Sequence, residues 1–254
     1  MALITCDFFS ESLEFGQSMT VVLPQATQAQ VGVTSAGGVD GDGPPVLYLL
    51  HGMSDDHTAW LRYTSIERYA TAAGLAVVMP AAARSFYTDE AHGHAYWTFV
   101  ADELPEIVSS FFRVSTRPER TYVAGLSMGG YGAVRLALAR PGRYAAAASL
   151  SGALDIVRRA GEPVRREEMH GRIFGGPPDP EHDLFALLDR AHPDDVPPLH
   201  ISCGGEDRLL EDSQEFLRRA EATGLDVTGD FPPGDHEWGL WDRVIQDVIA
   251  WLPR

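Results

Sequence analysis

The chain has 254 residues, of which 44% are hydrophobic and 22% are charged, as is typical of a globular protein. Its formal net charge of −16 repels nucleic acid and anionic lipid surfaces, so we expect neither as a partner. No apolar stretch reaches the roughly 18 residues that a membrane span requires. The two cysteines, Cys6 and Cys203, match no metal-ligand spacing, and we expect no metal or cofactor. The N-terminus lacks a basic stretch followed by a long apolar run, which favours a cytoplasmic protein with reduced thiols.

Short apolar runs alternate with longer amphipathic segments along the chain. This pattern predicts an α/β fold, with a mostly parallel central sheet and helices on both faces. Several of the runs are apolar nearly throughout, as expected for strands that are covered on both faces. The predicted strands are Met19–Leu23, Val46–Leu50, Leu75–Met79, Thr121–Ala124, Ala145–Leu150, Leu199–Cys203 and Val227–Phe231. The predicted helices are Ser65–Ala73, Ala101–Phe112, Gly130–Ala139, Asp183–Ala191, Asp212–Ala222 and Trp241–Trp251.

We expect residues 1–254 to form a single domain, because open α/β sheets often reach this length. Residues 32–45 are rich in Gly, Asp and Ser and predict a loop or hairpin tip between two early strands. Residues 156–198 interrupt the alternation, and we predict a cap-like excursion over the carboxyl edge of the sheet. Glutamates are interleaved with the arginines of this segment, which favours a solvated helix face over a phosphate site. These arginines are Arg158, Arg159, Arg165, Arg166 and Arg172.

The segment Ala124–Ala133 contains the pattern G-x-S-x-G, with Gly125, Ser127 and Gly129 at the fixed positions. An apolar strand precedes the pattern and a helix-forming run follows it, which is the context of a nucleophile elbow. In such an elbow the serine occupies a strained turn, and its hydroxyl projects beside a helix N-terminus. A chance match is the alternative, which this context disfavours. The pattern therefore predicts Ser127 as the nucleophile of a serine hydrolase.

Acyl transfer requires hydrogen-bond donors for the carbonyl oxygen as it becomes an oxyanion. The backbone N–H of Met128, directly after the nucleophile, is one predicted donor. The second is expected in the loop after strand Val46–Leu50, where the chain continues His51-Gly52-Met53. We predict the backbone N–H of Met53 as that donor and a structural role for His51.

A serine needs a base to accept its proton, and in α/β-hydrolases the chain order is serine, acid, histidine. His236 lies in the loop between the last predicted strand and the last predicted helix, so it is the predicted base. His200 falls within a strand and His192 precedes a proline, and both fit poorly.

The acid is expected after strand Leu199–Cys203, where Gly204-Gly205-Glu206-Asp207 follows. Asp207 is the predicted acid and Glu206 the second choice. Asp235 is adjacent to the base in sequence, and neighbouring side chains rarely face each other productively.

Aromatic residues and one further histidine cluster in the segments expected above the sheet, and together they suggest a small apolar acyl pocket. Each of them taken alone is more often a core residue. Arg84 and Arg208 are weak candidates for holding a substrate carboxylate. The predicted pocket residues are His57, Trp60, Phe86, Tyr87, Tyr96, Trp97 and Trp238.

Five stretches of the sequence together resemble the tributyrin-esterase branch of the esterase D/S-formylglutathione hydrolase family. The resemblance implies an α/β-hydrolase fold and carboxylesterase activity on short-chain acyl esters, with Ser127, Asp207 and His236 at the triad positions. It also implies a homo-oligomer, with dimer and tetramer both open. The matching stretches are Cys6–Ser10, Leu50–Trp60, Arg84–Asp89, Gly125–Gly132 and Asp235–Trp238.

Four functions remain to be weighed. The preferred one is a serine esterase acting on a small-molecule oxygen ester, because the Ser-Gly-Leu-Thr-Cys motif of S-formylglutathione hydrolases is replaced here by the His51-Gly52 segment. The alternatives are an S-formylglutathione hydrolase-like thioesterase or an acyltransferase. A non-catalytic binding protein is disfavoured, because every expected site residue is present.

Overall fold

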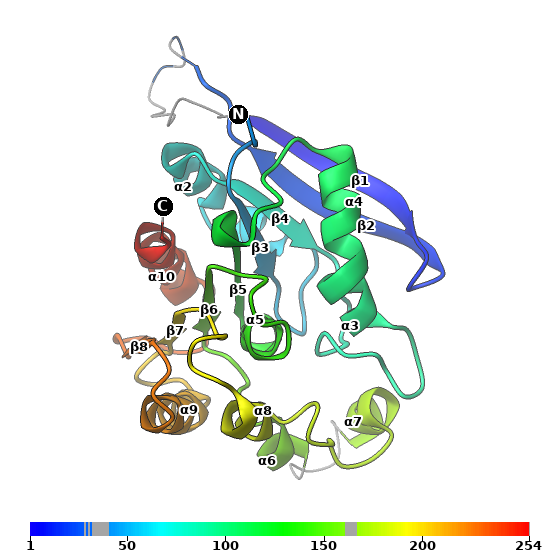
Figure 1. Cartoon of the computed structure of the whole chain (residues 1–254), viewed down its shortest axis with the longest axis vertical. Helices are drawn as coiled ribbons and strands as arrows, with labels where there is room; N and C mark the ends of the chain where they lie inside the picture. The colour runs from blue at the N-terminus through cyan, green and yellow to red at the C-terminus, as the bar shows by residue number, and fades with distance from the viewer. Residues whose placement is uncertain (28, 30, 32–40, 161–166, 254) are drawn as a thin grey trace.

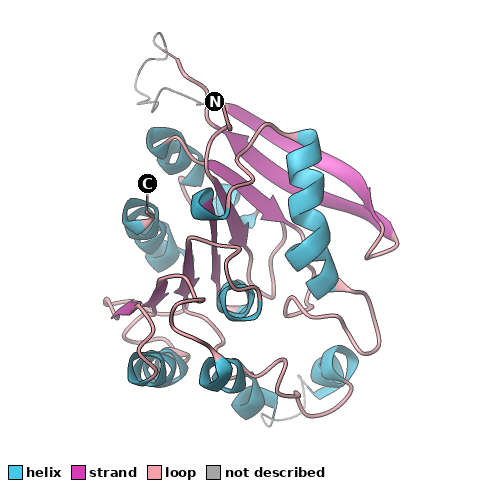
Figure 2. Cartoon of the chain, in the orientation of Figure 1, coloured by secondary structure: helices cyan, strands magenta, loops and turns pink. Residues whose placement is uncertain are grey.

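The computed structural model describes residues 1–27, 29, 31, 41–160 and 167–253. Within these ranges the strands form one eight-stranded sheet in the order β1-β2-β4-β3-β5-β6-β7-β8. The pairs β1–β2 and β2–β4 are antiparallel, and all the other neighbours are parallel (Figures 1 and 2). The strands are β1 (Ala2–Ser10), β2 (Phe15–Leu23), β3 (Val46–Leu50), β4 (Ala76–Pro80), β5 (Thr121–Leu126), β6 (Ala146–Leu150), β7 (Leu199–Ser202) and β8 (Val227–Asp230).

Helices cover both faces of the sheet (Figure 1). One face carries α1 (Ala59–Tyr63), α2 (Ile66–Ala73) and α10 (Trp238–Trp251), whose apolar residues form one core cluster with the sheet. In α10 these residues recur three and four positions apart, which gives the helix one buried stripe. The other face carries α4 (Leu104–Phe111), α5 (Met128–Ala139), α8 (Leu184–Arg190) and α9 (Leu210–Ala222).

The predicted α/β-hydrolase type of fold is confirmed. All seven predicted strands are found, with ends that differ from the prediction by at most two residues, except that β2 begins four residues earlier than predicted. The prediction missed β1, an edge strand. Its apolar residues lie on both faces, since Phe8 packs on the core while Leu3 and Phe9 are exposed, and this hides the alternation of a half-buried strand.

The predicted helix Ala101–Phe112 is divided, because α3 (Tyr96–Thr98) and a π-helical turn (Phe99–Glu103) precede α4. The carboxylate of Glu103 accepts hydrogen bonds from the Ser10 hydroxyl at 2.7 Å and from the Glu11 N–H at 2.8 Å. The turn therefore places Glu103 against the hairpin that joins β1 to β2.

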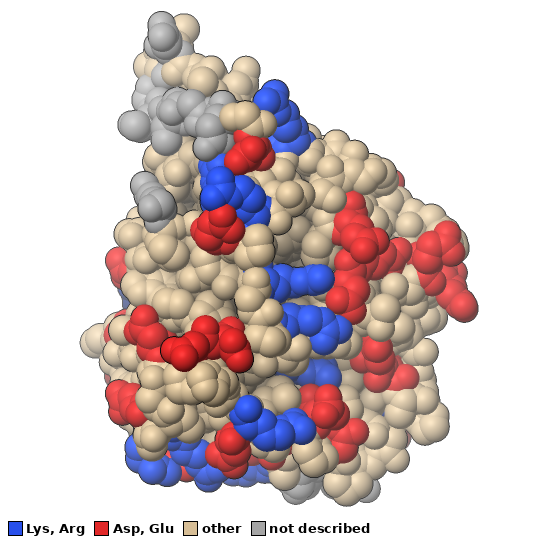
Figure 3. Space-filling model, viewed as in Figure 1, with Lys and Arg blue, Asp and Glu red and all other residues tan. Residues whose placement is uncertain are grey.

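The predicted cap segment contains α6 (Ile156–Ala160), α7 (Glu167–Phe174) and α8, between β6 and β7. Residues 32–40 of the predicted loop, and Arg165 and Arg166 of the arginine-rich segment, lie outside the described residues. Acidic and basic side chains are interspersed on the face shown in Figure 3. In the described ranges no helix combines the length and the apolar character that crossing a bilayer demands.

Arg159 departs from the predicted solvated face, because it is buried. Its Nη2 lies 2.6 Å from Oδ2 of Asp212, whose side chain in α9 is 1% exposed. Arg158 contacts the same carboxylate. Burial keeps the pKa of Asp212 above its ordinary value even with these two guanidinium groups beside it. The pairing attaches α6 to α9 and so holds the cap segment on the main sheet.

We expect Asp212→Ala to lower the free energy of unfolding by about 3 kcal/mol, because it leaves the Arg159 guanidinium buried without this partner. Glu211→Ala is the matched control, since Glu211 pairs with Arg158 but its side chain is 82% exposed. The control should cost less than about 1 kcal/mol. Urea denaturation of both variants measures the difference, and equal losses would contradict the structural role of Asp212.

Candidate active site

Ser127 occupies the turn between β5 and α5, with φ 53° and ψ −114°. A positive φ is strained for a residue with a side chain and costs about 1–3 kcal/mol. Two backbone hydrogen bonds hold the turn: the Ser127 N–H donates to Leu150 O at 2.9 Å, and the Ala153 N–H donates to Ser127 O at 3.1 Å. The β6 end of the sheet therefore fixes the backbone of the predicted nucleophile.

Two glycines make this turn sterically feasible. A Cβ on Gly125 would lie 2.4 Å from the carbonyl oxygen of Gly129, and a Cβ on Gly129 would lie 2.4 Å from that of Leu50. Both distances are too short for any side chain. The first turn of α5 therefore packs directly on the end of β3, beside the segment that carries the second predicted oxyanion donor.

The structure brings Ser127, His236 and Asp207 into one hydrogen-bonded row. His236 Nε2 lies 3.0 Å from Ser127 Oγ, and His236 Nδ1 lies 2.8 Å from Asp207 Oδ2. The three residues follow β5, β8 and β7, so all of them stand at the carboxyl edge of the sheet. The His236 ring also packs edge-on against Trp241, with its centroid 4.9 Å away, which limits its rotation.

The surroundings of Asp207 favour its ionised form. Its side chain is fully buried, and burial opposes ionisation, but hydrogen bonds from His236 and from the Leu209 N–H at 2.9 Å outweigh this effect. The pKa of Asp207 is consequently below its ordinary value. An ionised Asp207 accepts a hydrogen bond from the Nδ1–H of His236, which leaves Nε2 free to accept the proton of the Ser127 hydroxyl.

The other sequence candidates make different contacts. The Glu206 N–H donates to Gly234 O at 3.0 Å, and the Glu206 carboxylate accepts a hydrogen bond from the Gly234 N–H at 2.5 Å, so Glu206 joins the two loops. Asp235 accepts a hydrogen bond from the backbone N–H of His236 at 2.7 Å. His200 lies in β7, with Nε2 3.0 Å from Asp230 Oδ1, and His192 lies near Asp194.

His51 locks the segment that contains Met53. Burial lowers the pKa of His51, so the ring is neutral. Its Nε2 accepts a hydrogen bond from the Ala82 N–H at 2.9 Å, which requires the proton to sit on Nδ1, where it is donated to Gly52 O at 2.7 Å. The Tyr87 hydroxyl donates to His51 O at 2.9 Å. The segment after β4, which carries Ala82 and Tyr87, thereby fixes the backbone that leads to Met53.

Two hollows meet at Ser127. The smaller and less open one, which we call the enclosed hollow, has a volume of about 20 Å³ and is lined by Met53, Phe86, Ser127, Met128, Ala153, Arg159, His170, Arg208 and Leu209. The larger one, which we call the open cleft, has a volume of about 220 Å³ and is lined by Gly52, Met53, Ser54, Asp55, Leu126, Ser127, Arg208, His236, Trp238 and Trp241.

Of the predicted pocket residues, Phe86 lines the enclosed hollow and Trp238 the open one. The predictions of Tyr87 and Trp60 as pocket residues are wrong, because these side chains are 0% and 1% exposed. Tyr87 supports His51, and Trp60 donates from Nε1 to Leu50 O at 3.1 Å. Both rings are therefore part of the hydrophobic core.

The remaining predicted pocket residues line neither hollow. His57 Nδ1 lies 2.8 Å from Thr20 Oγ1, Tyr96 is buried, and the Trp97 ring lies 4.2 Å from the Arg135 guanidinium. The sequence prediction omitted Trp241, which lies three positions after Trp238 on the same face of α10 and could have been found by that spacing.

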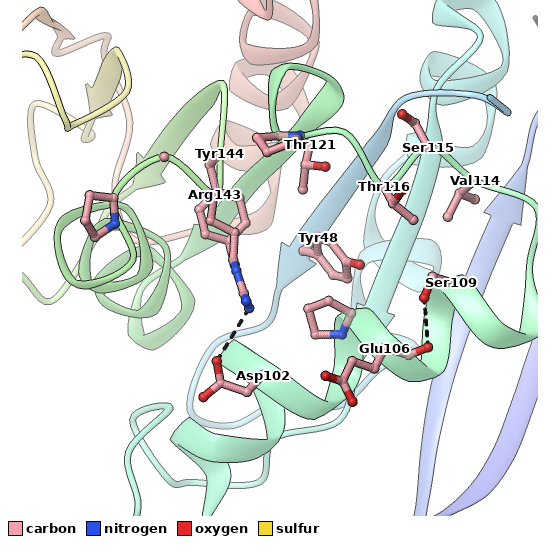
Figure 4. Close-up of a pocket in the computed structure, with 14 residues that line it drawn as sticks. Tyr48, Asp102, Glu106, Ser109, Val114, Ser115, Thr116, Thr121, Arg143 and Tyr144 are labelled. Atoms are coloured by element: carbon pink, nitrogen blue, oxygen red, sulfur yellow. Dashed lines mark hydrogen bonds and ion pairs between the residues drawn. The ribbon is translucent and has the colours of Figure 1, made fainter.

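A third hollow, more voluminous than these two, lies away from Ser127 at the opposite end of β5 (Figure 4). It measures about 390 Å³ and includes Thr121, the first residue of β5, which a six-residue strand separates from Ser127 by roughly 20 Å. Figure 4 shows Asp102 paired with Arg143 there, beside several hydroxyl groups. Its described lining includes no histidine to activate a hydroxyl, so this hollow is a poor candidate for the hydrolytic site.

Comparisons with known proteins place the chain among esterases and serine hydrolases. The Esterase family model matches residues 23–252. The solved structure of FphF, a fluorophosphonate-binding serine hydrolase of Staphylococcus aureus, is 31% identical with a TM-score of 0.85, and the match covers 99% of this chain and 98% of that one. An S-formylglutathione hydrolase (FrmB) from the same organism is 32% identical, with a TM-score of 0.84 and the same coverage. An acetyl esterase of Caldicellulosiruptor saccharolyticus is 27% identical, over 100% of this chain and 99% of that protein.

The match to the family model spans nearly the whole chain, and the similar solved structures are serine hydrolases of the same fold. The chain therefore belongs to the Esterase family and is a carboxylic ester hydrolase of the α/β-hydrolase type.

Proposed function

We propose that the protein is a serine carboxylesterase that hydrolyses short-chain acyl esters, as tributyrin esterases do, through an acyl-enzyme on Ser127. The observation that carries this proposal is the row in which His236 Nε2 lies 3.0 Å from Ser127 Oγ and Nδ1 lies 2.8 Å from Asp207. Such a row combines a nucleophile, a base and a carboxylate that orients the base.

In the first half-reaction, Ser127 Oγ attacks the ester carbonyl carbon while His236 Nε2 takes its proton. The oxyanion is stabilised by the backbone N–H groups of Met53 and Met128. Both residues line the enclosed hollow beside Ser127, and Met128 is the first residue of α5, where the helix dipole favours negative charge. The imidazolium of His236, stabilised by ionised Asp207, then protonates the departing alcohol.

In the second half-reaction, a water molecule gives its proton to the same nitrogen of His236 and attacks the acyl carbon. The tetrahedral intermediate uses the same two donors, and its collapse releases the acid and restores the Ser127 hydroxyl. The locked tautomer of His236 serves both steps, because Nδ1 stays bonded to Asp207 throughout.

The size of the enclosed hollow supports a short acyl group. Its volume of about 20 Å³ only slightly exceeds the roughly 10–15 Å³ that one water molecule needs, which favours the smallest acyl groups over long chains. Phe86 and Ala153 form part of its apolar wall. The open cleft of about 220 Å³ is the place for the alcohol part of the ester.

We expect Ser127→Ala to lower the kcat for p-nitrophenyl acetate by at least about 10⁴-fold, since no nucleophile then faces His236. The control is Ser109→Ala in α4, where the exposed hydroxyl donates to Glu106 O at 2.9 Å. It should keep full activity. A Ser127→Ala protein that is folded by circular dichroism and still turns over would refute the proposed mechanism.

An acyl-length series of p-nitrophenyl esters should show kcat/KM for acetate at least about tenfold above that for octanoate, since the enclosed hollow excludes extra methylenes. Phe86→Ala should move the optimum to longer chains, because it widens that hollow. Phe111→Ala, which removes an exposed ring on α4, should leave the profile unchanged. A profile that rises with chain length in the unaltered enzyme would count against the assigned acyl pocket.

A thioester substrate is the second candidate, and it is favoured by the S-formylglutathione hydrolase that is 32% identical to this chain. We expect the kcat/KM for S-formylglutathione to be lower than that for p-nitrophenyl acetate, since the loop after β3 carries His51-Gly52 and no cysteine. Parallel assays on one enzyme preparation decide this. A clear preference for the thioester would reassign the substrate and leave the Ser127 mechanism intact.

A further inference from the structure

Arg208 stands where the two hollows meet. It lines both the enclosed hollow and the open cleft, and it directly follows Asp207 in the loop after β7. The residue is exposed, and its guanidinium makes no hydrogen bond or ion pair with any residue in the described part of the chain. A positive charge is therefore available beside the nucleophile without an internal partner.

The other charged residues around the hollows differ from Arg208. The guanidinium of Arg159 is paired with the buried carboxylate of Asp212 at 2.6 Å. Asp55 lines the open cleft, but its carboxylate folds back over the loop, since Oδ2 lies 2.9 Å from the point where a Cβ on Gly52 would stand. Among the described lining residues, Arg208 thus provides the guanidinium that is available to bind a substrate.

The sizes of the two hollows indicate that Arg208 would contact the alcohol part of the ester. The enclosed hollow of about 20 Å³ has no room for a charged group in addition to a short acyl chain. The open cleft has about 220 Å³, and the rings of Trp238 and Trp241 form part of its wall. A flat, apolar alcohol part that ends in an anion would contact both the rings and the guanidinium.

We propose that Arg208 is a specificity-determining residue that selects short-chain esters whose alcohol part carries a carboxylate. This inference rests on the proposed esterase function of Ser127. A guanidinium binds a carboxylate through two parallel hydrogen bonds, which gives a preferred orientation as well as attraction. The charge also offsets locally the net charge of −16, which otherwise repels an anionic substrate.

The test compares three acetate esters with the same aromatic frame: 4-acetoxybenzoate, the neutral 4-acetoxybenzamide and the cationic (4-acetoxyphenyl)trimethylammonium. We expect the unaltered enzyme to prefer the benzoate to the benzamide by about two- to tenfold in kcat/KM, mainly through KM, because the pair is exposed to water. Arg208→Gln should abolish this preference and Arg208→Glu should reverse it in favour of the cation. The preference should also fall in about 0.5 M NaCl, where exposed charges are screened.

Arg84→Gln is the matched control, because Arg84 is exposed and lines neither hollow, and it should keep the preference. Equal benzoate-to-benzamide ratios in the unaltered enzyme and Arg208→Gln would overturn the proposal. A greater dependence on Arg208 for 4-acetoxyphenyl phosphate than for the benzoate would overturn the assignment of a carboxylate. Failure of the esterase function itself looks different, since then none of the esters is hydrolysed.

Discussion

The site depends on one strained turn, in which Ser127 holds a positive φ of 53° between β5 and α5. The strain, about 1–3 kcal/mol for such a conformation, persists because the surrounding structure leaves no alternative. Gly129 packs on the carbonyl of Leu50, so the start of α5 is in direct contact with the end of β3. The same contact that forces the turn also sets the distance between the serine and the loop that carries Met53.

The parallel sheet then gathers the remaining groups. The β3, β5, β6 and β7 strands run side by side in one direction, so the loops after β3, β5 and β7 open at one edge. His236 reaches that edge from the loop after β8, and Asp207 meets it there at 2.8 Å. The chain order of serine, acid and histidine thus follows from strand order, because each group needs only to follow the end of its own strand.

Much of this arrangement could be predicted from the sequence, because it is encoded locally. The G-x-S-x-G pattern and its flanking strand and helix define the turn at Ser127, and position after a strand identifies Asp207 and His236. Their role in catalysis remains a proposal that the geometry supports. The Gly52–Met53 segment was likewise expected from its place after β3, whereas the hydrogen bonds of His51 that lock it in place were not expected. That lock needs Ala82 N–H and Tyr87, which come from another loop.

Residues whose environment is set by distant partners could not be predicted in the same way. Trp60 and Tyr87 look like pocket residues from their positions on connecting segments, but the core takes both rings. Arg159 looks like a solvated residue among glutamates, but it is buried because Asp212 lies opposite it on α9. In each case the decisive neighbour is far along the chain, so no local pattern reveals it.

The most direct test of the proposed mechanism is to label the unaltered enzyme with a fluorophosphonate and to locate the adduct by mass spectrometry of its peptides. We predict a single phosphonyl group on Ser127, because this hydroxyl faces His236 Nε2 at 3.0 Å. A folded, active enzyme that carries the adduct on another residue, or carries none, would contradict the central role given to Ser127.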